Sequence, residues 1–202
     1  MSVDWVRAKF VYNNPYHDYV RYSSLELVAR EIYKNKIAGN VAELGVFRAD
    51  FARCINLIFP DRKLYLFDTF AGFDNCELEN EQKQGLYTPD KFVFKDTTVN
   101  LVLSKMKHKN NCVIKQGYFP ETAYNIEDTF AFVSIDVDLS ESTYNGLCWF
   151  YPRMEKGGYI FVHDFNNKKW TGAKVGVEKF VAEFNASYFP LSDKSGSVVF
   201  VK

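Results

Sequence analysis

Carboxylates close an apolar segment of the chain in "FVSIDVDLSESTYNGL", residues 132–147. Asp136 and Asp138 follow the hydrophobic run directly, and Glu141 comes shortly afterwards. Acids in this position either cap the next helix or hold a cation or a proton at a site. The dipole of the following helix favours Glu141 as a first-turn acid, which leaves Asp136 and Asp138 as the candidates for chemistry.

Residues that could contact a ligand close several other apolar segments as well. Because ligands of an open α/β sheet bind outside the carboxyl ends of its strands, acids at several strand ends would meet at one edge. A single acid could simply cap a helix, but acids after four segments predict a shared site. The residues are Glu43 with Gly45, Asp68, Asp136 with Asp138, His163 with Asp164, and, after a fifth segment, Gly117.

The hydrophobic pattern predicts the elements that position these residues. Nearly all-apolar strands that alternate with helices indicate a mostly parallel sheet covered on both faces, to which residues 184–202 could add a hairpin-like edge. The first helix would begin at Ser23 or Ser24, whose hydroxyl can cap its N-terminus. We expect strands within residues 40–47, 63–70, 111–119, 130–138, 159–165 and 195–202, and helices within residues 23–37, 48–59, 96–109, 142–154 and 172–184.

The bulk composition fits one globular domain over residues 1–202. Lys plus Arg and Asp plus Glu both number 25, so no global field would attract nucleic acid or anionic lipid. The four cysteines form no CxxC pair, the N-terminus lacks the apolar core of a signal peptide, and no apolar run is long enough to span a membrane. The sequence therefore predicts a cytoplasmic protein with no nucleic-acid or membrane partner.

Two segments stand apart from the alternating pattern. Residues 1–22 are aromatic and irregular, which is compatible with a homodimer contact, and Arg21 and Tyr22 at their end could reach the cleft. Residues 74–95 are polar, rich in Glu and Gln, and without a clear period. Loops of this length are usually lids or disordered, so we expect a lid loop that helps to select a small-molecule or glycan acceptor.

The first strand-to-helix turn, "ELGVFRAD", indicates the kind of ligand. It holds one glycine, whereas a dinucleotide fold needs G-x-G-x-x-G to approach a pyrophosphate, and the chain has no P-loop. Glu43 before the turn suits a cationic part of a ligand. Asp68, some 23 residues past Gly45, lies where an acid can accept both hydroxyls of a ribose. A ribose with a positive group and no phosphate describes S-adenosylmethionine.

Four blocks of the sequence also resemble a known family, the macrocin O-methyltransferases of the TylF/MycF type. The blocks are "VAELGVFRADFA", "LYLFDTFAGF", "KQGYFPET" and "SIDVDLSESTYNGLCWFYPRMEKGGYIFVHDF". The resemblance implies a class I methyltransferase, Rossmann-like α/β fold with a seven-stranded sheet whose last strand is antiparallel. It also implies an enzyme that uses S-adenosylmethionine and a divalent metal to methylate sugar hydroxyls.

The resemblance further implies which residues bind the cofactor. Glu43 and Gly45 would line its methionine part, and Asp68 would accept hydrogen bonds from the ribose hydroxyls. Gly117 and Tyr118 would border the adenine.

The remaining functional positions of the family fall after the fourth and fifth strands. The acid that ends the fourth strand corresponds to Asp136, which would contact the cofactor and a metal. The paired acids after the fifth strand correspond to His163 and Asp164, so the metal ligands would be Asp136, His163 and Asp164. We expect Mg²⁺, which two carboxylates can hold, with Mn²⁺ as the alternative that a histidine ligand would favour. This chain departs from the family pattern in having His163 in place of a carboxylate and Ala49 in place of a glycine.

The sequence thus predicts O-methylation of a hydroxyl on a sugar or glycosylated small molecule. Asp136, Asp138 or His163 would accept the hydroxyl proton. One alternative is an O-methyltransferase for catechol-like diols, which the same metal would chelate. Another is a non-catalytic module that binds S-adenosylmethionine, an alternative that the replacement of an acid by His163 favours.

Overall fold

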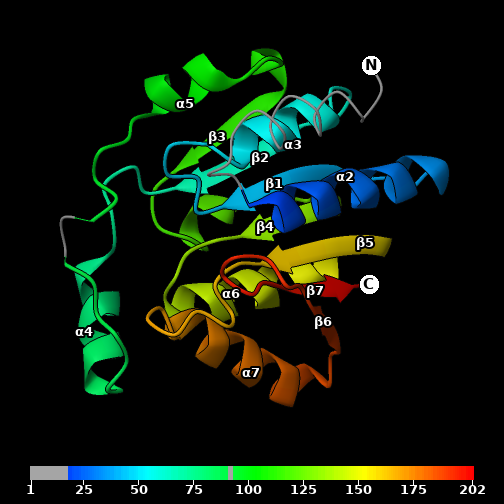
Figure 1. Cartoon of the computed structure of the whole chain (residues 1–202). Coiled ribbons are helices and arrows are strands. Elements are labelled where there is room, and N and C mark those ends of the chain that lie inside the picture. Colours follow the sequence, from blue (N-terminus) through cyan, green and yellow to red (C-terminus); the bar gives the residue numbers. More distant parts are fainter. Residues whose placement is uncertain (1–17, 91–92) are drawn as a thin grey trace.

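The computed structural model describes residues 18–90 and 93–202. One sheet runs through the middle of the molecule, with helices on both faces (Figure 1). Its strands are β1 Asn40–Leu44, β2 Leu64–Asp68, β3 Cys112–Gln116, β4 Phe130–Ile135, β5 Met154–Val162, β6 Tyr188–Pro190 and β7 Val198–Val201.

The order of the seven strands is β3-β2-β1-β4-β5-β7-β6. Strands β1 to β5 are parallel to one another, whereas β7 pairs antiparallel with both β5 and β6. The expected mostly parallel sheet with a hairpin-like edge is therefore confirmed. Because the chain leaves β1 towards one edge and β4 towards the other, the carboxyl ends of these two neighbours border the crevice where such sheets bind ligands.

Among residues 18–90 and 93–202, five helices cover the two faces of the sheet. Helices α2 Tyr19–Lys34, α3 Ala52–Ile58 and α5 Val99–Lys105 pack on one face, and α6 Ser140–Phe150 and α7 Gly172–Phe184 pack on the other (Figure 1). The expected positions of these helices are confirmed to within a few residues, apart from the start of the first.

Successive residues of the central strands enter two separate hydrophobic cores. In β1, Val41 packs with α2 and α3, whereas the next residue, Ala42, packs on the side of α6 and α7. Both side chains are fully buried. Strand residues alternate between the two faces, so burial of both faces accounts for the nearly all-apolar strands in the sequence.

Helix α2 begins about one turn earlier than the sequence indicated, and the predicted cap at Ser23 or Ser24 is wrong. Asp18 caps the helix instead, because its carboxylate accepts hydrogen bonds from the backbone N–H groups of Val20 and Arg21. The extra turn carries Arg21 inward against the sheet, where 7% of its surface is exposed. The prediction of the helix start relied on the spacing of apolar residues. Arginine is not apolar, so the pattern gave no sign that this turn is helical and buried.

The segment 74–95 is not an irregular loop throughout, because it contains helix α4, Asn75–Lys83. Asp74 caps this helix by accepting hydrogen bonds from the N–H groups of Cys76 and Glu77. The buried side of α4 carries two carboxylates, Glu77 and Glu81, which hydrophobic periodicity cannot recognise. The helix lies beyond the carboxyl ends of the strands, at the left of Figure 1.

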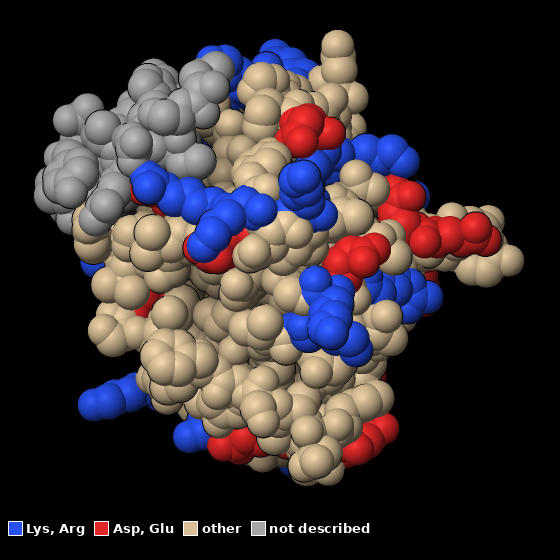
Figure 2. Space-filling model, turned by 90° about the vertical axis from the view of Figure 1, so that its right-hand side faces the viewer, with Lys and Arg blue, Asp and Glu red and all other residues tan. Residues whose placement is uncertain are grey.

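Charges of both signs neighbour one another on the surface of the molecule. On the face in Figure 2, Lys and Arg side chains lie interspersed with Asp and Glu, which agrees with the formal net charge of zero. Among the helices of residues 18–90 and 93–202, none combines the length and the apolar character needed to cross a membrane.

Candidate active site

A pocket of about 350 Å³ opens at the carboxyl ends of β1, β2 and β4. It lies at the expected crevice of the sheet, and its volume is in the range of small-molecule sites. All nine residues to which the sequence assigned a role line this one pocket, although the individual roles stay predictions. They are Glu43, Gly45, Asp68, Gly117, Tyr118, Asp136, Asp138, His163 and Asp164.

Gly45 allows the turn after β1 to approach the end of β4 closely. Its φ is +86°, and a Cβ atom at this position would lie 2.0 Å from the backbone oxygen of Asp136. Only glycine adopts this conformation without strain and leaves room for the neighbouring backbone. The single glycine of this turn therefore lets the backbone after β1 pack against the end of β4 at the bottom of the pocket.

Asp68 ties the same turn to the end of β2. Its Oδ2 accepts hydrogen bonds of 2.8 Å from the N–H groups of both Val46 and Phe47, and its Oδ1 accepts one of 2.7 Å from Phe70. A carboxylate oxygen has two acceptor positions, so Oδ1 retains one for a ligand hydroxyl. Asp68 can thus fix the turn and contact a ribose at once.

Glu43 presents an unsatisfied polar group to the pocket. The side chain is buried, and its Oε2 has no hydrogen-bond partner within the described part of the chain. Burial raises the pKa of this carboxyl well above its ordinary value, although the nearby Arg21 opposes the change. Buried polar atoms are rarely left without a partner, so the position fits a donor group of a bound cofactor.

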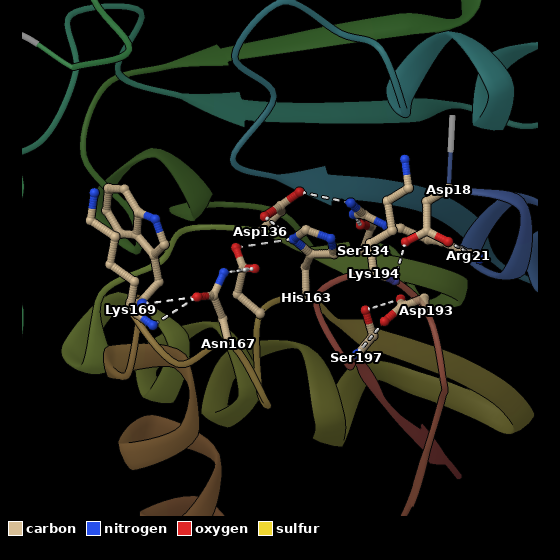
Figure 3. A network of polar contacts seen from close by, with 12 residues as sticks. Asp18, Arg21, Ser134, Asp136, His163, Asn167, Lys169, Asp193, Lys194 and Ser197 are labelled. Carbon is tan, nitrogen blue, oxygen red and sulfur yellow. Dashed lines mark hydrogen bonds and ion pairs between the residues drawn. The ribbon is translucent and has the colours of Figure 1, made fainter. Parts of the chain in front are cut away.

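Asp136 lies between two basic side chains (Figure 3). Its Oδ2 is 3.0 Å from Nη1 of Arg21, and its Oδ1 is 3.0 Å from Nδ1 of His163. Arg21 also donates through Nη2 to Oγ of Ser134, and its guanidinium lies 4.1 Å from the ring centre of Phe51. These contacts hold Arg21 firmly beside the end of β4.

Asp164 completes the contacts of His163 on the other side. Its Oδ2 lies 3.1 Å from the same Nδ1 of His163, and its Oδ1 accepts a 2.8 Å hydrogen bond from Nδ2 of Asn167. Asn167 is itself fixed, since its Oδ1 accepts hydrogen bonds from the N–H groups of Lys169 and Trp170. Both carboxylate oxygens of Asp164 are therefore occupied within the protein.

The electrostatics of this cluster separate its acids into two kinds. Burial alone would raise the pKa of Asp136 and of Asp164, but the neighbouring cations outweigh it and hold both pKa values below the ordinary range. Burial likewise opposes the charge of His163, yet Asp136 and Asp164 raise its pKa to about 10. For Asp138, burial and the neighbouring carboxylates of Asp136 and Asp164 act together and raise the pKa well above its ordinary value.

Asp138 has an unusual backbone as well as an unusual pKa. Its φ is +63°, in the left-handed region that few residues other than glycine adopt. Backbone strain of this kind clusters at functional sites, where the surrounding structure enforces it. The side chain is half-buried and lines the pocket.

Several pocket residues carried no clear signal in the sequence. Phe47, Phe73 and Phe94 form part of the wall, and the Phe94 ring lies within 5.4 Å of both others, centre to centre. Phenylalanine is frequent in this chain, so composition alone could not single these three out. Arg21 and Tyr22 do line the pocket, as the sequence suggested.

Helix α4 closes one side of the pocket by docking on the N-terminus of α6. Glu77 accepts hydrogen bonds of 2.6 and 2.8 Å from the N–H and Oγ of Ser142, and Glu81 accepts from the N–H and Oγ of Ser140. Carboxylates satisfy the free N–H groups at a helix start and interact favourably with its dipole. The two glutamates therefore anchor α4.

Replacing Glu81 by Ala should loosen this anchor. Hydrogen bonds to charged groups contribute about 1.5–3 kcal/mol, so we expect a loss of that size in the local opening free energy of α4. Amide hydrogen exchange of residues 75–83 would measure it. Glu79→Ala, at an exposed position of the same helix, is the matched control. Equal exchange in the two variants would contradict the anchoring role.

The strand order, the antiparallel β7 and the pocket at the switch point define a class I methyltransferase fold. The sequence profile of the family described as Macrocin-O-methyltransferase (TylF) matches residues 18–189. The chain belongs to this family, whose members are O-methyltransferases.

Three relatives illustrate the similarity. Demethyldecarbamoylnovobiocin O-methyltransferase of Streptomyces niveus is 23% identical over 180 residues, which cover 82% of this chain. The match spans 66% of the length of that relative. In fold, the chain is similar to the O-methyltransferase NovP, with a TM-score of 0.74, 19% identity and coverage of 91% of this chain and 80% of NovP. It is also similar to CalS11, a calicheamicin methyltransferase, with a TM-score of 0.68, 19% identity and coverage of 98% and 91%.

Proposed function

We propose that this protein transfers a methyl group from S-adenosylmethionine to a hydroxyl of a sugar or a glycosylated small molecule. The observation that carries the proposal is that Glu43, Gly45 and Asp68, which suit the cofactor, line the same pocket as Asp138, a carboxyl group of raised pKa. Glu43, Gly45 and Asp68 could bind the cofactor, and Asp138 could remove a proton from the acceptor hydroxyl.

The residues fit S-adenosylmethionine in hydrogen bonding and shape. The unpartnered Glu43 oxygen and the free acceptor position of Asp68 offer sites for donor groups, and Gly45 leaves space where a side chain would intrude. When bound, the cofactor supplies the electrophilic methyl group. The pocket residues then orient the acceptor oxygen for attack on that methyl group and exclude water.

Among the three candidate bases, the surroundings favour Asp138. Both oxygens of Asp136 are engaged by basic side chains, and its pKa is low. His163, with a pKa of about 10, already carries its proton near neutral pH. In its ionised form, Asp138 is a stronger base than an ordinary carboxylate because burial and the neighbouring acids raise its pKa, so we assign the acceptor's proton to this form of Asp138.

A divalent metal fits the cluster less well than the sequence suggested. Asp136, His163 and Asp164 each offer a ligand atom, and these atoms lie within 4.8 Å of one another. However, Nδ1 of His163 is bonded to both acids, and Arg21 occupies the other oxygen of Asp136. A metal ion would have to displace these contacts, so the proposed reaction has no step that requires one.

The acceptor class rests on the family and on the names of relatives. The family is described by its action on macrocin, and the relative from Streptomyces niveus by its action on demethyldecarbamoylnovobiocin. CalS11 is described as a TDP-rhamnose 3'-O-methyltransferase. Catechol-like diols are less favoured, because their recognition by chelation would depend on the metal. A cytoplasmic location, a homodimer, the single domain over 1–202 and a lid role for 74–95 stay predictions.

Calorimetric titration of S-adenosylmethionine tests the cofactor part of the proposal. We expect binding in the micromolar range and its loss in Gly45→Ala, whose Cβ would collide with the backbone of Asp136. The control is Gly85→Ala, which has a similar positive φ of +70° but no neighbouring atom within 4 Å of its Cβ. Thermal unfolding of both variants separates the loss of binding from the loss of folding. A wild-type protein that binds no S-adenosylmethionine would refute the proposal.

An acceptor panel tests the reaction itself. Nucleotide sugars, glycosides and catechols would be incubated with the cofactor, and mass spectrometry would detect methylated products. Products from the sugar classes support the proposal, whereas product from catechols alone would favour the diol alternative. Cofactor binding without any product would favour the non-catalytic module.

A further inference from the structure

Two basic side chains, Arg21 and His163, contact the acids to which a metal ion would bind. Arg21 and His163 together contact three of the four carboxylate oxygens of Asp136 and Asp164, and Asn167 contacts the fourth. No oxygen of these two acids is therefore left without a partner. Each of these oxygens keeps a second acceptor position, but a metal ion held by all three side chains would compete with the contacts that Nδ1 of His163 makes to both acids.

The surroundings of Arg21 make it a permanent member of the cluster. Its side chain is 9% exposed, is carried by the first turn of α2, and bonds Ser134 as well as Asp136. Phe51 covers the guanidinium plane. Moving this group away would leave a buried cation without its acid, which costs several kcal/mol.

Arg21 already places one permanent positive charge in the cluster. Its guanidinium lies 3.0 Å from Oδ2 of Asp136, and Nδ1 of His163 lies 3.0 Å from Asp136 and 3.1 Å from Asp164. A divalent ion would add two positive charges next to a guanidinium, in a pocket that is also to hold a sulfonium cofactor.

We propose that this chain functions without a resident divalent ion, with Arg21 and His163 as the basic side chains that hold the acids at the ends of β4 and β5 in position. The inference builds on the proposed function, because it states how that site works. His163 stands where the family resemblance places a carboxylate. The site therefore lacks one of the carboxylate ligands that the family pattern offers a divalent ion. Arg21 and His163 are positioning residues, and proton transfer stays with Asp138.

A titration of chelator-treated protein with Mn²⁺ and Mg²⁺ tests this inference directly. Wild-type protein should show no saturable binding up to about 1 mM of either ion. His163→Asp puts a third carboxylate beside Asp136 and Asp164, and should bind Mn²⁺ with a Kd of about 10 μM or below, which is about 100-fold below the limit of about 1 mM set for the wild type. His163→Asn is the matched control, since it removes the imidazole without adding a carboxylate, and should not gain binding.

Two results would overturn the inference. The first is stoichiometric, saturable Mn²⁺ or Mg²⁺ binding by the wild type that disappears in Asp164→Asn. The second is a folded His163→Asp variant that binds no metal, because the imidazole would then not be what keeps the ion out. If His163→Asp fails to fold, Arg21→Gln takes its place, since it frees Oδ2 of Asp136 and should gain about tenfold in Mn²⁺ affinity. An unchanged affinity there would also count against the inference.

A failure of the metal inference can be distinguished from a failure of the proposed function. Metal titrations are run without cofactor, and cofactor titrations are run in the presence of chelator. A wild type that binds neither S-adenosylmethionine nor metal would refute the proposed function while leaving the metal pattern as expected. Methylated product that forms equally well with and without chelator would support both.

Discussion

Asp138→Asn should lower kcat by about 10²–10⁴-fold and leave cofactor affinity nearly unchanged, because it removes the group that accepts the acceptor's proton. The substitution preserves shape, and asparagine tolerates the left-handed backbone that Asp138 adopts at φ +63°. The fold should therefore survive. Steady-state rates of product formation, together with calorimetric cofactor binding, would measure the two effects.

The pH profile gives a second measure of the same role. Burial and the neighbouring Asp136 and Asp164 raise the pKa of Asp138 above the ordinary 3.8. A base works only when ionised, so kcat should fall as the pH drops, and the midpoint should lie well above that of an ordinary aspartate. Asp50→Asn, at another acid of the pocket lining, should change neither kcat nor the profile. A kcat of Asp138→Asn close to that of the wild type would remove Asp138 from the mechanism.

Asp136→Asn should cause the largest loss of stability, about 3 kcal/mol, because it leaves Arg21 and His163 without their shared carboxylate. For a domain of this size, that loss lowers the Tm by about 6–12 °C. Chemical denaturation and calorimetry would measure it. Asp96→Asn, which breaks an exposed ion pair with Arg48, is the control and should cost less than about 1 kcal/mol.

The loss caused by Asp136→Asn should depend on pH in a defined way. The pKa of Asp136 is lowered in the folded protein, so its contribution is present above about pH 3.8 and disappears as the pH falls through the folded value. The pKa of His163 is raised to about 10, so its contribution is complete below pH 6.5 and is lost as the pH rises to 10. The difference between wild type and variant should therefore be widest between about pH 4 and 6.5 and narrower near pH 10. A pH-independent difference would contradict the ion-pair assignment.

The sequence was most informative where burial and chain order leave few choices. Apolar strands that alternate with amphipathic helices predicted the parallel sheet, and the rule that ligands bind at carboxyl strand ends brought Glu43, Asp68 and Asp136 to one pocket. The sequence was less informative where a helix packs against the rest of the protein through charged side chains. Helix α4 is buried through Glu77 and Glu81, and the first turn of α2 through Arg21, and neither leaves a hydrophobic period.

The sequence by itself determined the sheet, the site at its edge and the identity of the acids there, because these follow from local patterns and from the family resemblance. Only the tertiary structure decided how the acids are balanced. Arg21 and Asp136 are 115 residues apart in the chain, and nothing local couples α2 to the end of β4. Their ion pair exists because the fold buries both groups together, and the same fold places two carboxylates beside His163.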